Sequence, residues 1–377
     1  MPRAAGAVKP LFIGHDIFRR STYGGRHPLA IPRVSACIDL CQALGWIDPN
    51  RYIVSSQATP AQLHRFHDPD YVAALQSVEA GAPLTAEMKA RYNIGINGNP
   101  VFAEIFSRPA TACGATLTAA EILREPGVIY SPAGGTHHGR PAQASGFCYL
   151  NDPVLGILAF LDQGVDRLLY IDIDAHHCDA VQDALAGDPR VRILSVHESG
   201  RWPRTGALDD DGGGTVFNVP VPAGFHDDDM ALLLDALIQP LAEAFRPQVV
   251  ILQAGADALS EDPLARLELS NNAHWSVVRA VTAMADRVLV TGGGGYNPWS
   301  VARCWAGAWA TIEGHAIPDR LPAEAEALLR SFTWERSAGR NPPAHWFNTL
   351  RDAPRNGPVS PMVRDAVNAL RPRLAAV

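Results

Sequence analysis

Two carboxylates and an imidazole alternate in the segment Asp172-Ile-Asp174-Ala-His176, directly after a run of apolar residues. In an extended strand, this alternation would bring all three side chains to one side of the chain. Burying two carboxylates so close together is costly unless a cation or a paired imidazole neutralises them. The pattern therefore favours a divalent metal site, although a helix cap or a salt-bridged strand end would also explain it.

A further acid, Asp257, follows another apolar run in the segment Gly255-Ala-Asp257. Because it arrives at the end of a different strand, it is the expected third ligand beside Asp174 and His176. Two Asp and one His that leave a position open for water are typical of catalytic zinc, which keeps three protein ligands. The sequence thus predicts a metal site that takes part in a reaction.

Two adjacent histidines, His137 and His138, lie between Gly134-Gly-Thr and Gly139. Glycine allows the backbone to approach a ligand closely, and neighbouring loop residues can direct two imidazoles into one cavity. Imidazole titrates near neutral pH, so the pair could supply a general base and a general acid. A single histidine would more often be a surface or core residue, whereas this pair near a metal-like cluster favours catalysis.

The tract Gly292-Gly-Gly-Gly295 directly precedes Tyr296. It lacks the Lys-Ser/Thr of a P-loop and the spacing of a dinucleotide-binding motif, so nucleotide binding is not expected. Consecutive glycines would let the phenol reach over a site and donate a hydrogen bond to a developing oxyanion. A tight turn with a Tyr that only packs would have the same sequence, and the tract alone leaves both interpretations open.

The elements that must position these residues are short apolar runs that alternate with longer helical patterns. Such alternation predicts an α/β fold with a mainly parallel sheet of eight strands and helices on both faces. The carboxyl ends of parallel strands meet at one edge, so we expect the four polar segments together there. The expected strands are Leu11–Ile13, Tyr52–Val54, Val128–Tyr130, Leu168–Ile173, Val191–Val196, Val216–Val219, Val249–Leu252 and Val288–Val290. The expected helices include Val34–Leu44, Pro109–Leu123, Asp152–Gln163, His226–Ala244 and Asn271–Ala285.

The composition bounds the class of protein. With 377 residues and 47% hydrophobic content the chain can bury a large core, and its formal charge of −7 gives no electrostatic reason to bind nucleic acid. No apolar run reaches the roughly 20 residues that span a membrane, and Met1–Pro10 has no apolar signal-peptide core. The six cysteines form no CxxC pair, which indicates reduced thiols in the cytoplasm. We expect one domain over 1–377, in which 317–377 form an irregular extension packed on the core and ending in a helix near Ser360–Leu370.

Five segments of the chain, in order and with compatible spacing, closely resemble motifs of the zinc-dependent histone deacetylase family. That family includes bacterial acetoin-utilization-type deacetylases and acetylpolyamine amidohydrolases. The resemblance runs from about His27 to Gly314 and implies a single-domain arginase/deacetylase-like fold. It also implies a hydrolase that removes acetyl or related acyl groups from acyl-lysine or a small acylated amine. The five segments are Gly134-Gly-Thr-His-His-Gly, Ala144-Ser-Gly-Phe-Cys-Tyr-Leu-Asn-Asp152, Tyr170-Ile-Asp-Ile-Asp-Ala-His-His, Leu252-Gln-Ala-Gly-Ala-Asp257 and Gly292-Gly-Gly-Gly-Tyr-Asn297.

The resemblance also implies roles for individual residues. The implied ligands of one Zn²⁺ ion per chain are Asp174, His176 and Asp257. The implied catalytic residues are His137 with Asp172 behind it, His138 with Asp179 behind it, and Tyr296 as the group that polarises the acetyl carbonyl. The implied substrate-binding residues are Gly146 and Phe147 in the acyl-chain tunnel, Trp202 opposite, Leu264 at the mouth, and Gly294 and Gly295. Arg33 corresponds to an arginine of an internal acetate channel, and a structural K⁺ ion is implied near Asp172, Asp174, His176, Ser195 and Val196.

The chain departs from the family pattern at three places. Cys178-Asp179-Ala180 stands where the family usually has Gly-Asp-Gly. Gly98 stands where histone-active members have an Asp that holds the substrate backbone, which argues against peptide docking. Leu264 stands where some polyamine-specific relatives have an acidic residue, which argues against a polyamine. The sequence therefore leaves the substrate open between protein acyl-lysine and a small acylated amine, and it leaves open the oligomeric state and the choice between zinc and iron.

Two other classes of function fit parts of the pattern. A non-enzymatic protein could use the same pocket to bind an acylated ligand, and Cys178 and Ala180 beside the metal strand are the features in its favour. A binuclear ureohydrolase would need a second acidic cluster near Asp257, but Ala256 and Ala258 flank that residue. The sequence therefore favours a mononuclear amidohydrolase.

Overall fold

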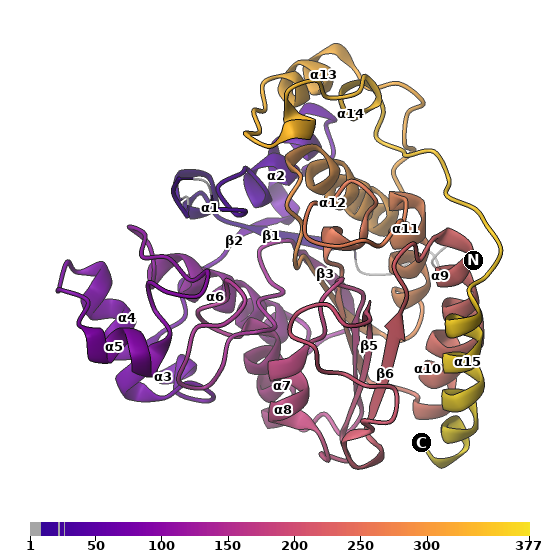
Figure 1. Ribbon diagram of the computed structural model, residues 1–377, viewed down its shortest axis with the longest axis horizontal. Coiled ribbons are helices and arrows are strands. Elements are labelled where there is room, and N and C mark those ends of the chain that lie inside the picture. Colours follow the sequence, from indigo (N-terminus) through magenta and orange to yellow (C-terminus); the bar gives the residue numbers. More distant parts are fainter. Residues whose placement is uncertain (1–8, 22, 26) are drawn as a thin grey trace.

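The computed structural model, which describes residues 9–21, 23–25 and 27–377, is built around one central sheet (Figure 1). In this part of the chain the sheet has eight strands in the order β2-β1-β3-β8-β7-β4-β5-β6, and every neighbouring pair is parallel. The expected α/β class and all eight expected strands are therefore confirmed. The strands are β1 Leu11–Gly14, β2 Tyr52–Val54, β3 Gly127–Ser131, β4 Leu168–Asp172, β5 Val191–Glu198, β6 Val216–Val221, β7 Val249–Gln253 and β8 Arg287–Thr291.

Helices cover both faces of the sheet because successive strand residues point to opposite sides. On β4, Leu169 and Ile171 join one apolar cluster, while Leu168 and Tyr170 join the cluster on the other face. Strands buried on both faces need continuous apolar residues, which explains the runs in the sequence. One cluster includes α2 Val34–Ala43, α9 Asp227–Leu233, α10 Gln239–Phe245, α11 Asn271–Val281, α12 Pro298–Glu313 and α15 Pro361–Leu370. The other includes α6 Ser107–Ile122, α7 Asp152–Asp162 and α8 Asp179–Leu185.

The long helix expected over His226–Ala244 is interrupted by a π-helical turn, Leu234–Ile238, between α9 and α10. Pro240 is the second residue of α10, so the carbonyl four residues before it, that of Ala236, lies within this turn. Proline has no N–H to donate, and its ring clashes with the carbonyl four residues earlier in a regular helix. The wider turn accommodates the ring without ending the helix.

A separate lobe lies beside the sheet, at the left of Figure 1. It consists of α3 Pro60–Leu63, α4 Pro69–Glu79 and α5 Ala86–Tyr92, which pack through Tyr71 and Leu75 on a third apolar cluster. That cluster also contains Leu150 and Tyr296, both from loops at the carboxyl edge of the sheet. The lobe therefore forms one side of the region where the chemically interesting residues meet.

The segment 317–377 contains more helix than the single one expected near its end. Besides α15 it has α13 Ala323–Arg330 and α14 His345–Asn348, and buried side chains of all three join the main apolar cluster. Arg303 of α12, which is fully buried, pairs with Asp352 and also donates through Nε to the Thr349 carbonyl at 2.8 Å. None of the described helices is long and apolar enough to span a membrane.

Candidate active site

The four polar segments meet at the carboxyl edge of the sheet, as the alternation of strands and helices predicts. They follow β3, β8, β7 and β4, which are adjacent in the sheet and parallel. The segment after β3 carries His137 and His138, and the one after β8 carries Tyr296. Asp257 lies in a short 3-10 turn after β7, and Asp174 follows the end of β4. Parallel pairing is thus what brings together residues more than 150 positions apart.

The expected metal ligands Asp174, His176 and Asp257 are buried, and one possible ligand atom of each lies within 4.8 Å of the other two. His176 Nδ1 is 2.9 Å from Asp257 Oδ2 and 3.2 Å from Asp174 Oδ1. Strand β4 already ends at Asp172, so alternation along a strand does not align the three groups. Instead, the chain turns, and the backbone N–H groups of Asp174 and His176 donate at 3.0 Å to the carboxylates of Asp172 and Asp174.

The surroundings of this cluster fit a bound cation. Glycine is required at 255 and 294, because a Cβ at either position would collide with the carboxylate of Asp174 or Asp257. Burial and the nearby Asp174 carboxylate raise the pKa of Asp257 to about 6, which shows how unfavourable two buried negative charges are here. A divalent cation would offset that repulsion, and two carboxylates with one imidazole are a donor set that suits zinc.

Each histidine of the adjacent pair has its own carboxylate partner. His137 Nδ1 lies 2.8 Å from Asp172 Oδ2, and His138 Nδ1 lies 2.7 Å from Asp179 Oδ1, as expected from the resemblance. The two ring centroids are 4.0 Å apart, and both rings are buried. A carboxylate at Nδ1 orients the imidazole and leaves Nε2 for the reacting groups.

The two imidazoles differ strongly in pKa. Burial lowers the pKa of His137, but the carboxylates of Asp172 and Asp174 outweigh it and raise the value to about 9. Burial and the charge of His137 lower the pKa of His138 to about 3, against the opposing effect of Asp179. A neutral base therefore stands beside a charged imidazole. A cation in the metal cluster would lower both pKa values further, because like charges repel.

Two residues that the motif contained, but to which the sequence assigned no role, hold the histidine loop. The buried carboxylate of Asp152 accepts hydrogen bonds from the backbone N–H of Gly135 and Thr136 and from the Thr136 and Thr116 hydroxyls. Asn151 donates through Nδ2 to the carbonyls of His137, at 3.2 Å, and Gly139. Asn151 is also the N-cap of α7. An Asn directly before an expected helix is the sequence feature that could have indicated its structural role.

Tyr296 is positioned by an acid that sequence reasoning also missed. Asp262 accepts from the backbone N–H of Tyr296 at 2.7 Å and of Leu264 at 2.8 Å. It thereby fixes both the phenol-bearing residue and the residue at the tunnel mouth. Burial and the charges of Asp257 and Asp174 raise the pKa of Tyr296 well above its ordinary value, so the phenol keeps its proton.

An entrance cavity leads to this cluster. Its lining includes the expected Gly146, Phe147, Trp202 and Leu264, together with His138, His176 and Tyr296. The rings of Trp202 and His138 pack edge to face with their centroids 4.6 Å apart. The rings of Phe147 and Tyr296 do the same with their centroids 6.0 Å apart. Gly295 does not line the cavity; a Cβ there would meet Val301 and Ala256.

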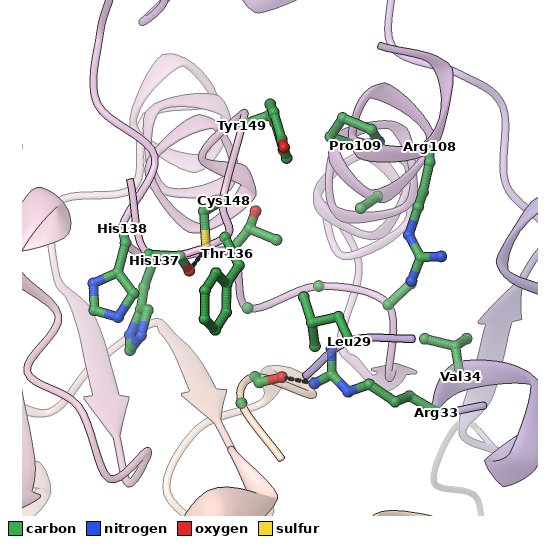
Figure 2. A pocket seen from close by; sticks show the side chains of 18 of the residues that line it. Leu29, Arg33, Val34, Arg108, Pro109, Thr136, His137, His138, Cys148 and Tyr149 are labelled. Carbon is green, nitrogen blue, oxygen red and sulfur yellow. Dashed lines mark hydrogen bonds between the residues drawn. The ribbon is translucent and has the colours of Figure 1, made fainter. Parts of the chain in front are cut away.

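An inner cavity of about 70 Å³ continues on the far side of the same residues (Figure 2). His137, His138, Gly294 and Tyr296 line one end. Figure 2 shows the two imidazoles on one side and the guanidinium groups of Arg33 and Arg108 on the other. The expected channel residue Arg33 therefore lines this cavity, and Arg108 was not expected.

The remaining expected residues lie close to the metal cluster. Asp172 and Ser195, from the implied K⁺ site, are paired in the register of β4 and β5, and Val196 follows on β5. Cys178 and Ala180 are buried at the start of α8, on either side of Asp179. Burial and the Asp172 charge raise the pKa of the Cys178 thiol well above its ordinary value, so this cysteine is an inert packing residue.

Comparison with known proteins identifies the family of this chain. Residues 27–312 match the histone deacetylase domain. The chain is 36% identical over 310 residues to histone deacetylase 1 of Oryza sativa subsp. japonica, covering 80% of this chain and 59% of that protein. It thus spans about three fifths of the length of that relative. It is 33% identical over 326 residues to the acetoin utilization protein AcuC of Bacillus subtilis, covering 82% of this chain and 84% of AcuC.

Two solved structures share the whole fold. An HDAC homolog from Aquifex aeolicus superposes with a TM-score of 0.91 at 35% identity, and an HDAC homolog complexed with SAHA superposes with a TM-score of 0.92 at 35% identity. Each comparison covers 97% of this chain and 100% of the other. The chain belongs to the histone deacetylase family, as the sequence motifs suggested.

Proposed function

We propose that this protein is a zinc-dependent amidohydrolase that removes an acetyl or related acyl group from acyl-lysine or a small acylated amine. The observation that carries the proposal is the convergence of a buried Asp-His-Asp cluster, two His–Asp pairs and Tyr296 between the entrance and inner cavities. The similarity to an HDAC homolog that was solved in complex with SAHA supports a deacetylase function. We further propose that residues 1–377 form one deacetylase domain.

In this proposal Asp174, His176 and Asp257 hold one Zn²⁺ ion, and Asp172, Asp174, His176, Ser195 and Val196 contribute to a structural K⁺ site. When bound, Zn²⁺ supplies a Lewis acid for the amide carbonyl and lowers the pKa of a water molecule to about 7. The protein's own groups then have to move protons and stabilise charge.

His138, which is neutral, accepts a proton from the attacking water at Nε2 and later donates it to the leaving amine. The imidazole of His137 and the phenol of Tyr296 donate hydrogen bonds that stabilise the negative charge developing on the carbonyl oxygen. Asp172 and Asp179 orient the rings through Nδ1 and stabilise their charged forms. Phe147 and Trp202 exclude water from the substrate stem on the entrance side.

The entrance side favours recognition of the amine component by shape. No carboxylate is among the described residues that line the entrance cavity. Gly98 has a positive φ of 81°, and a Cβ there would press against the Phe147 ring, so a larger residue at 98 would disturb the tunnel wall. The substrate stem is thus held between aromatic rings, with no acidic group to pair with a substrate backbone or a polyamine.

The test is a substrate panel with purified protein loaded with zinc. Acetyl-lysine peptides, free acetyl-lysine and acetylpolyamines should include at least one substrate whose hydrolysis stops on chelation and returns with added Zn²⁺. Metal analysis should give about one ion per chain, and Asp257→Ala should lose it while keeping the circular-dichroism spectrum. Absence of metal-dependent hydrolysis across the panel would overturn the proposal.

A further inference from the structure

The inner cavity carries an inference that rests on the proposed function and extends it to the substrate class. We propose that the enzyme accepts acyl groups that end in a second carboxylate, such as succinyl, and that Arg33 and Arg108 bind that carboxylate in the inner cavity. The resemblance assigned Arg33 to a channel for released acetate and assigned nothing to Arg108.

The two guanidinium groups are poorly satisfied by the protein. Arg108 donates one hydrogen bond, from Nη1 to the Ser21 carbonyl at 2.8 Å, and Arg33 donates through Nη2 to the Gly293 carbonyl. The Nε of Arg33 is buried and has no hydrogen-bond partner. A guanidinium has five N–H donors, so within the described part of the chain most donors of both arginines have no protein acceptor.

Neither arginine has a carboxylate counterion. No ion pair of Arg33 or Arg108 occurs among the described residues, and the residues outside that set, 1–8, 22 and 26, include no Asp or Glu. Burial and the nearby Arg33 charge lower the pKa of Arg108, although Tyr23 and the Glu104 carboxylate, which forms no ion pair with Arg108, oppose this. Guanidinium nonetheless stays protonated in proteins, so the cavity wall keeps two positive charges.

Aromatic contacts stabilise these cations only in part. The Arg33 guanidinium lies 5.1 Å from the Trp305 ring centroid, and that of Arg108 lies 5.2 Å from Tyr23 and 5.5 Å from Phe18. Such contacts position a cation but accept no N–H hydrogen bonds. A planar carboxylate is the ligand that the guanidinium fork pairs with directly. The chemistry of the wall therefore selects a small organic anion.

The cavity is continuous with the place of reaction. Its lining runs from His137, His138 and Tyr296 to Arg33 and Arg108. The link is short: Gly294 donates through its N–H to the metal ligand Asp174 at 2.6 Å, and the carbonyl of the preceding Gly293 accepts from Arg33. An acyl chain whose carbonyl lies at the metal cluster would extend past the glycines toward the guanidinium groups.

The available volume agrees with a short chain. About 70 Å³ is several times the space of about 10–15 Å³ that one water needs. It is therefore more than the methyl group of an acetyl requires. The reaction itself is unchanged: water adds its oxygen to the acyl carbon, the C–N bond breaks, and the amine leaves with a proton. The products are the free amine and a dicarboxylate, with no other reactant.

The experiment compares kcat/KM for three acyl-lysine substrates that differ in the acyl group: acetyl, succinyl and 4-methylpentanoyl, which has nearly the shape of succinyl without its charge. The zinc-loaded protein should prefer succinyl to 4-methylpentanoyl by about tenfold or more. Arg108→Gln should bring that ratio close to one, and Arg108→Lys should retain part of it. Arg124→Gln is the matched control, because Arg124 is exposed, pairs with Glu121 and lies near the other end of α6.

A binding measurement supplies a readout that does not depend on turnover. Calorimetric titration of the metal-free protein with succinate should show binding that Arg108→Gln weakens about tenfold and Arg124→Gln does not. If acetyl-lysine is hydrolysed but succinyl shows no advantage over 4-methylpentanoyl, the inference is wrong while the proposed function stands. If no acyl-lysine and no small acylated amine is hydrolysed, the proposed function fails, and Arg108-dependent succinate binding alone then decides whether the cavity is an anion site.

Discussion

The two His–Asp pairs of the active site have nearly the same local geometry and opposite electrostatics. Their Nδ1–carboxylate distances are 2.8 and 2.7 Å, and both rings are buried. Yet the pKa of His137 is raised to about 9 and that of His138 is lowered to about 3. Hydrogen-bond geometry alone therefore does not assign a role to a histidine.

The difference arises from the groups around each carboxylate. His137 lies near two carboxylates, because its Nδ1 is 2.8 Å from Asp172 and its Nε2 is 3.8 Å from Asp174. Asp179 behind His138 is shared with Arg140, whose Nη2 lies 2.6 Å away. Burial and the charge of His137 lower the pKa of His138, whereas the Arg140 guanidinium acts on the Asp179 carboxylate and lowers its pKa. The result is a base and a charged donor on adjacent residues.

The largest expected effect separates the roles of the two rings. His138→Ala should lower kcat for an acyl-lysine substrate by about 10³–10⁴, because it removes the group that both accepts and donates the proton. His137→Ala should lower kcat by about 10², since it removes only charge stabilisation. Steady-state kinetics with metal content verified in each variant checks this order. Equal losses would show that the two rings share the proton transfers.

Tyr296→Phe should have an intermediate effect, a loss of about 10²–10³ in kcat, because one hydrogen-bond donor to the developing oxyanion is removed. The ring remains, so KM should change little. If Tyr296 and the charged His137 stabilise the same oxygen, the double variant should lose less than the product of the two single losses. Independent, fully multiplicative losses would place the two groups on different atoms.

A smaller effect is expected from Arg140→Gln. Without the guanidinium, the Asp179 carboxylate acts more strongly on His138 and raises its pKa. The base is active in its neutral form, so the acid limb of the kcat/KM profile should move to higher pH, by about one unit or less, while activity at pH 8 stays nearly constant. The same profile in the exposed control Arg65→Gln should match the unmodified protein. An unmoved acid limb would mean that Arg140 does not tune the pair.

A third buried histidine, His67, has no acid partner, and its protonation affects the stability of the fold. Burial lowers the pKa of His67 to about 4, although the Pro141 and Arg140 carbonyls oppose this. In the unfolded chain its pKa is about 6.5, so only the unfolded state binds a proton between these values. His67 therefore stabilises the fold fully above about pH 6.5, and this contribution is lost as the pH falls toward 4.

The sign can be checked by measuring the free energy of unfolding with denaturant between pH 4.5 and 7.5. Below pH 6.5, the free energy of unfolding of the unmodified protein should rise with pH more steeply than that of His67→Gln, by about 1.4 kcal/mol per pH unit. Above pH 7 the two curves should run parallel. Parallel curves over the whole range would show that His67 takes up its proton while the protein is folded.

Much of the architecture was predictable because the strands are buried on both faces. All eight apolar runs became strands, and the four polar segments fell at adjacent strand ends. The interrupted helix around Pro240 and the extra helices of 317–377 were harder to predict from the sequence, because they depend on tertiary packing. Residue types and motif order indicated Asp174, His176 and Asp257 as candidate metal ligands, but a turn after β4 and not strand alternation brings these three groups together.

What the sequence by itself determined is the set of chemical groups and their order: two acids and an imidazole for a metal, two histidines for protons, and a phenol after glycines. Residue types and short spacings carry that information locally. Only the tertiary structure decided which charged groups lie close enough to change each other's pKa. The different pKa values of His137 and His138, the support of Tyr296 by Asp262, and the joint presence of Arg33 and Arg108 in one cavity depend on contacts between distant segments. Such contacts follow from parallel pairing and packing, which no local pattern records.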